Sequence, residues 1–104
     1  RLRMKTIELK TVPMILHGAE SDFSYAEFIR ILMQTPEKPN EGAAIEEVRK
    51  SIRVLDALEE AGEVLEIEDA DFAYLLHRVN SARFTASNIV FVNFVDYICG
   101  IEKE

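Results

Sequence analysis

The side chains that most often carry out chemistry in proteins are few and scattered in this chain. It has two histidines, His17 and His77, and one cysteine, Cys99. Neither histidine stands in an HxxxH or HExxH arrangement, the helical spacing that brings zinc ligands together. Cys99 lies between Ile98 and Gly100 in an apolar run, which is typical of a buried structural cysteine. These residues predict no catalytic site, no cofactor and no metal centre.

Acidic residues are numerous, and their densest cluster is Glu66, Glu68, Asp69 and Asp71. A calcium loop that began at Asp69 would need a glycine at its sixth position, where Tyr74 stands instead. Carboxylates in the first turn of a helix are favoured by the helix dipole, so a structural role explains the cluster. A divalent ion at residues 66–71 is the open alternative. No pair of carboxylates is singled out for acid–base catalysis, and the sequence predicts that the protein is not an enzyme.

The net charge of −7 is unevenly distributed. Residues 41–71 hold eleven acidic and three basic residues, so this segment is more negative than the whole chain. Nucleic-acid phosphates would be repelled by such a surface. Glu59, Glu60 and Glu63 are the predicted acidic face, suited to a basic protein partner. No apolar run approaches the roughly 18–20 residues of a membrane span, so neither a nucleic acid nor a membrane is an expected partner.

Length and composition predict one folded domain over residues 1–104. The chain is 48% hydrophobic and 30% charged, which is ordinary for a globular protein. A single cysteine rules out an internal disulfide and indicates a reducing compartment. Arg1–Arg3 precede Met4, and we weigh equally that these residues are native or that they were added before a natural start at Met4.

Two short strands are expected. Residues 4–12 and 64–68 alternate polar and apolar side chains, and each is the other's best partner. Pro13 is expected to end the first strand or place it at a sheet edge, followed by a loop around residues 17–20. Ser24 and Glu27 form a capping-box pattern that predicts a helix over about 24–34.

Three further helices follow in the prediction. One covers about 43–61, with a buried stripe expected at Ile45, Val48, Ile52 and Leu55. The next begins after Asp69 as its cap and buries the stripe Phe72, Leu75, Leu76 and Val79. Thr85 or Ser87 is the expected cap of the last one. The fold class is therefore α+β, mostly helical, in the order β-α-α-β-α-α with a minor two-stranded antiparallel sheet.

The last helix rests on residues 89–101, of which ten of thirteen are apolar. A strand competes, because β-branched and aromatic residues are frequent there. Asn93, Asp96 and Gly100 favour a helix, since they share one narrow stripe only at helical spacing. Such a helix is either the centre of the core or an association surface. The candidate interface residues are Phe91, Phe94, Val95 and Ile98.

Part of the chain resembles a known group of proteins. The segments Ile52–Leu58 and Leu65–Leu76, with the later apolar helix that contains Ile89, Phe94 and Val95, resemble small proteins of tailed bacteriophages and prophages. The resemblance covers residues 52–98, about half the chain. Such proteins are often encoded among head and tail morphogenesis genes. The resemblance implies a bacterial host's cytoplasm, or the virion, and a role in virion assembly.

Two functions therefore compete. The first is a non-enzymatic phage-type structural or assembly protein that self-associates or binds another phage or bacterial protein. The second is a monomeric regulatory or adaptor module that engages a basic protein through the acidic face. Burial against a second copy would show as a stable oligomer, whereas electrostatic binding would be sensitive to salt.

Overall fold

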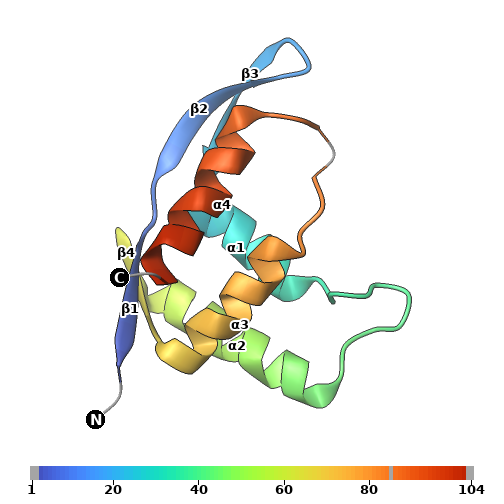
Figure 1. Ribbon diagram of the computed structural model, residues 1–104, viewed down its shortest axis with the longest axis vertical. Coiled ribbons are helices and arrows are strands. Elements are labelled where there is room, and N and C mark those ends of the chain that lie inside the picture. The colour runs from blue at the N-terminus through green and yellow to red at the C-terminus, as the bar shows by residue number, and fades with distance from the viewer. Residues whose placement is uncertain (1–2, 85, 103–104) are drawn as a thin grey trace.

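The computed structural model describes residues 3–84 and 86–102, and the predicted fold class is confirmed. Within these residues the chain forms four helices and two small antiparallel sheets (Figure 1). The elements in chain order are β1 (Met4–Glu8), β2 (Thr11–Leu16), β3 (Ala19–Ser24), α1 (Tyr25–Gln34), α2 (Ile45–Glu60), β4 (Val64–Glu68), α3 (Asp69–Asn80) and α4 (Ile89–Glu102). Arg1, Leu2 and Thr85, on which two of the predictions fall, lie outside the described residues.

The predicted pairing of the first strand with residues 64–68 is confirmed. β1 and β4 run antiparallel, from Met4 opposite Glu68 to Glu8 opposite Val64. Ile7 and Leu65 face each other in this register, and both are fully buried. The alternation seen in the sequence therefore sets which side of this ribbon covers the helices.

The expected loop around residues 17–20 is confirmed only at residues 17–18, which form the turn of a hairpin of β2 and β3, while residues 19–20 begin β3. The φ angles of His17 and Gly18 are both positive, at 55° and 81°. Two successive residues with positive φ form the two-residue turn whose twist matches that of a β-hairpin. The residues on either side of a two-residue turn, here Leu16 and Ala19, form a hydrogen-bonded pair. Along the two strands, hydrogen-bonded pairs then alternate with pairs that are not hydrogen-bonded. Pro13 consequently falls where its missing N–H would point away from β3, so the strand passes through it.

The core is centred on one stripe of α4. Phe94 and Ile98 are fully buried, and Ile101 continues the stripe one turn later. Phe94 packs edge-on against Tyr25 and Phe28 of α1, with ring centroids 4.7 and 5.2 Å apart. Aromatic pairs in this arrangement add to the free energy gained by burial alone. This stripe holds α4 against α1 and the base of the hairpin.

The predicted buried stripe of α2 is wrong at its two isoleucines, whereas Val48 and Leu55 are half-buried. Ile45 and Ile52 are 63% and 49% exposed, whereas Val54 and Leu58 of the adjacent stripe are buried. Ser51 shares the buried face, where its hydroxyl lies 2.9 Å from that of Tyr74 on α3. Both stripes repeat at helical spacing, so periodicity alone could not choose between them.

A buried arginine joins α3 to the ends of α1 and α2. Arg78 is only 4% exposed, and it donates hydrogen bonds to the Thr35 carbonyl oxygen at 2.7 Å and the Tyr74 hydroxyl at 3.2 Å. The Glu47 carboxylate lies 3.9 Å from the same guanidinium group. A buried charge is tolerated only when it is paired and hydrogen-bonded, and these contacts meet that requirement.

Truncation of the central aromatic ring tests the position of α4 in the core. We expect Phe94→Ala to lower the free energy of unfolding by about 3–5 kcal/mol, because a large cavity is left behind. Val92→Ala on the exposed side of the same helix should cost well under about 1 kcal/mol. Urea denaturation followed by circular dichroism measures both, and equal losses in the two variants would contradict this placement.

Candidate functional site

The structure divides the four candidate interface residues into two pairs. Phe94 and Ile98 have no exposed surface, so as interface residues they are corrected to core residues. Phe91 and Val95 are half-buried and line a hollow beside α4. The reason is geometric, since residues four apart share one helix face and that face packs on the aromatic cluster. A partner could reach only the second pair.

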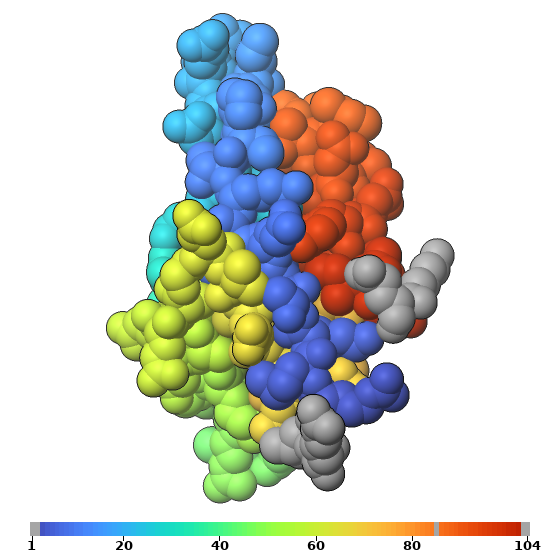
Figure 2. All heavy atoms as spheres, turned by 90° about the vertical axis from the view of Figure 1, so that its left-hand side faces the viewer, coloured from blue at the N-terminus to red at the C-terminus, as the bar shows by residue number. Residues whose placement is uncertain are grey.

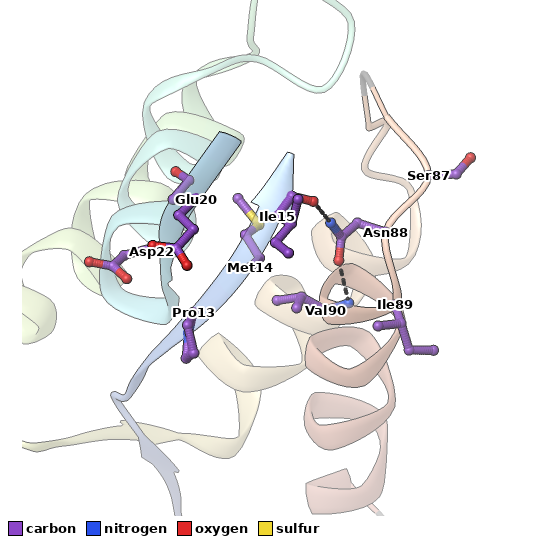
Figure 3. Close-up of a pocket in the computed structure, with 10 residues that line it drawn as sticks. Pro13, Met14, Ile15, Glu20, Asp22, Ser87, Asn88, Ile89 and Val90 are labelled. Atoms are coloured by element: carbon purple, nitrogen blue, oxygen red, sulfur yellow. Dashed lines mark hydrogen bonds between the residues drawn. The ribbon is translucent and has the colours of Figure 1, made fainter. Parts of the chain in front are cut away.

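The most exposed apolar side chains of α4 lie at its beginning. Ile89 and Val92 are 67% and 51% exposed, and their spacing of three places them on the same helix face. Ile15 of β2 is 66% exposed and lines the same groove as Ile89. In Figure 3 the Val90 side chain points toward β2, whereas that of Ile89 points away from it. We define the α4–hairpin surface as these three residues with their half-buried neighbours Met14, Val90, Phe91 and Val95.

The groove between the hairpin and the start of α4 has a volume of about 910 Å³. Asn88 bridges its two walls, as Figure 3 shows. Its side-chain N–H donates to the Ile15 carbonyl oxygen at 2.8 Å, while its side-chain oxygen accepts from the Val90 N–H at 2.9 Å. The cap of α4 is thus Asn88, whereas Thr85 or Ser87 was expected. This residue both begins the helix and fixes the hairpin beside it.

The outer edge of β2 is poorly suited to pairing with another strand. Pro13 has no N–H, and the Ile15 carbonyl oxygen is already bonded to Asn88. Natural sheets often block their edges with such devices. The α4–hairpin surface is therefore arranged to contact side chains more than backbone.

The rim of this surface is acidic. Glu20 and Asp22 of β3 line the groove, and Asp96 lines the hollow beside Val92. Within residues 3–84 and 86–102, none of the three carboxylates forms an ion pair, and no lysine or arginine lines either hollow. The negative charge at this rim is consequently uncompensated.

The predicted acidic face lies at a different place. Glu59 and Glu60 occupy the last turn of α2, and Glu63 follows just before β4. All three are exposed, and none forms an ion pair in the part of the chain that the structure describes. Figure 2 shows this region, in yellow-green, on the flank beside β1. Carboxylates at a helix C-terminus oppose the helix dipole, so they do not serve the stability of α2.

The acidic cluster at residues 66–71 is divided among different environments. Glu66 is exposed on β4, whereas Asp71 is buried and accepts a hydrogen bond of 2.9 Å from Arg53. This pairing, chiefly the hydrogen bond and then the charge of Asp71, raises the pKa of Arg53. α3 begins at Asp69 without a side-chain cap, so Asp69 is not the capping residue that was expected.

The two histidines and the cysteine lie in different parts of the fold and contact different residues. His17 is in the hairpin turn, His77 contacts Glu37 at 2.6 Å, and the half-buried Cys99 contacts Asn80 at 3.5 Å. Across the described residues, no group of three or more histidine, cysteine or acidic side chains is placed to hold a metal ion. In the same residues no helix is long and apolar enough to cross a bilayer.

Comparison with known proteins gives no match to a family model, to a curated protein or to a solved structure.

The double role of Asn88 can be separated by two substitutions. Asn88→Ala removes both the helix cap and the bond to the hairpin, and should lower the free energy of unfolding by about 1–2 kcal/mol. Asn88→Asp keeps an oxygen for the Val90 N–H but loses the donor to Ile15, so it should cost less than the alanine variant. Thermal unfolding measures stability, and hydrogen exchange at the Val90 amide reports the cap. An alanine variant as stable as the native chain would refute the bridging role.

Proposed function

We propose that this chain is a non-enzymatic structural or assembly protein that acts by binding protein through the α4–hairpin surface. The supporting observation is that Ile15, Ile89 and Val92 each expose half or more of their surface there. Ile15 and Ile89 line the groove, and Val92 lines the adjoining hollow. Adjacent exposed apolar residues of this size mark interaction sites more often than scattered ones do. The acidic rim around them matches the usual anatomy of an apolar centre with polar edges.

The division of α4 supports the same proposal. The stripe that contains Phe94 and Ile98 already supplies the core, so Ile89 and Val92 are not needed to hold the helix in place. Covering a fully exposed isoleucine or valine side chain is worth roughly 1.5–3 kcal/mol. Three such side chains on one surface can therefore contribute substantially to binding, although the costs of association reduce the net gain.

A phage-type assembly role is part of the proposal, and the resemblance of residues 52–98 to small phage proteins supports it. Assembly proteins act through surfaces and not through catalytic groups, which agrees with the apolar groove as the principal feature of this chain. The bacterial host's cytoplasm or the virion would then be its location.

A double substitution at the start of α4 tests the binding surface. Ile89→Ser/Val92→Ser should abolish association while changing the midpoint of thermal unfolding little, because both side chains are exposed. Association is measured in two ways: sedimentation of the purified chain, and anisotropy of a labelled helical peptide with a leucine stripe and a glutamine polar face. Ile45→Ser/Ile52→Ser on α2 is the matched control and should have no effect.

A chain that is monomeric and does not bind the glutamine-faced peptide would contradict the proposal. So would association that survives Ile89→Ser/Val92→Ser, or that is lost equally in the α2 control.

The acidic face supports a second candidate function, that of a regulatory or adaptor module for a basic protein. The specific observation is that Glu59 and Glu60 lie where the helix dipole disfavours them, with no basic residue in the last turn of α2. Charges placed at a cost to stability are common where a surface serves binding.

Neutralising these charges should separate stability from binding. Glu59→Gln/Glu60→Gln/Glu63→Gln should raise the midpoint of thermal unfolding by about 2–4 °C. If the face binds a basic partner, the same variant loses salt-sensitive affinity for an oligolysine probe, measured by anisotropy. Glu20→Gln/Asp22→Asn is the control and keeps that affinity. Equal affinity in the native chain and the triple variant would exclude this function.

A further inference from the structure

The rim of the α4–hairpin surface carries information about its partner. Resting on the function proposed above, we propose that the surface takes a helical segment of another protein, with an apolar stripe flanked by lysine or arginine. The apolar stripe would fill the groove between Ile15 and Ile89. The flanking cations would lie against Glu20 and Asp22 on one side and Asp96 on the other.

Charge complementarity selects this occupant. In the described part of the chain, the three rim carboxylates have no ion-pair partner, and neither hollow is lined by a cation. The position of Asp96 reinforces the pattern, because it follows Ile89 and Val92 at i+7 and i+4 and shares their helix face. A segment with lysine or arginine beside its apolar side chains would neutralise all three acids, whereas a neutral segment would leave them bordering a drier environment.

A second copy of this chain fits the surface less well. In a two-fold pairing each copy presents the same patch, so two acidic rims would be brought together and no cation of either patch would neutralise them. The other exposed apolar stripe, at Ile45 and Ile52 of α2, offers no better partner surface. Asp56 and Glu59 follow Ile52 at i+4 and i+7 and so stand on the same helix face. Each copy also carries a net charge of −7.

The blocked edge of β2 argues for a helical segment over an extended one. An added strand would need the N–H that Pro13 lacks and the Ile15 carbonyl oxygen that Asn88 occupies. A helix needs none of these groups, because its backbone is already hydrogen-bonded. Apolar side chains three and four residues apart on such a helix would enter the groove together.

Three labelled peptides test this inference. They share one helical leucine stripe and differ only in the polar face, which is lysine, glutamine or glutamate. We expect affinity to fall in that order, with about a tenfold difference between the lysine and glutamate peptides at low salt. Added salt should lower the affinity of the chain for the lysine peptide and leave its affinity for the glutamine peptide nearly unchanged.

The charged rim is tested with Glu20→Gln/Asp22→Asn. This variant should bind the lysine peptide about threefold to tenfold more weakly and keep its affinity for the glutamine peptide. Glu59→Gln/Glu60→Gln is the matched control, and it should leave both affinities unchanged.

The outcomes separate this inference from the function on which it rests. Equal affinity for all three peptides, abolished by Ile89→Ser/Val92→Ser, would overturn the basic partner and keep the binding surface. Dimers that dissociate in that double variant would likewise replace the basic partner with a second copy. A lysine preference that depends on Glu59 and Glu60 but not on Glu20 and Asp22 would move the site to the acidic face and overturn the inference. Binding to phosphatidylserine vesicles would overturn it as well, because the acidic rim should repel them.

Discussion

The packing of one side of α4 against the aromatic rings of α1 is the contact on which the rest of the molecule depends. Phe94 touches Tyr25 and Phe28, and Ile98 extends the same stripe toward β1. The Tyr97 hydroxyl accepts a hydrogen bond of 2.8 Å from the Glu8 N–H, so the chain's last helix is also joined to its first strand. Because these contacts connect residues far apart in sequence, they close the domain, and within the first turn of α4 only Ile89 and Val92 face outward.

Two polar side chains complete the arrangement at places that the apolar core does not reach. Arg78 holds the end of α1 against α2 and α3, and Asn88 holds the hairpin against α4. In both cases a single side chain meets backbone carbonyl oxygen of a distant segment, which gives direction as well as stability. The groove at the α4–hairpin surface exists because the second of these contacts sets the spacing of its walls.

Local patterns in the sequence predicted the fold class, the pairing of β1 with β4 and the existence of all four helices. These local patterns failed where two different structures fitted the same stretch of sequence equally well. Ile45–Ile52 and Val54–Leu58 are both valid helical stripes on α2, and only its contacts with α1, α3 and β4 decide between them. The hairpin was missed because Pro13 suggested a strand end, although Gly18 was a visible signal for a tight turn. Of the site, Phe91 and Val95 were found, whereas Ile15, Asn88 and the rim acids depend on contacts between distant segments.

The division of α4 into a buried stripe and an exposed first turn has a consequence for how such a chain can diverge. Substitutions at sites without shared neighbours are nearly additive, so changes at Ile89 or Val92 should be tolerated whatever occupies Phe94 and Ile98. Natural selection can therefore alter what the first turn recognises without lowering the stability that the buried stripe supplies. Stability and partner recognition can thus evolve separately within one helix. After gene duplication, a few point mutations in the first turn of α4 could give one copy a new binding partner.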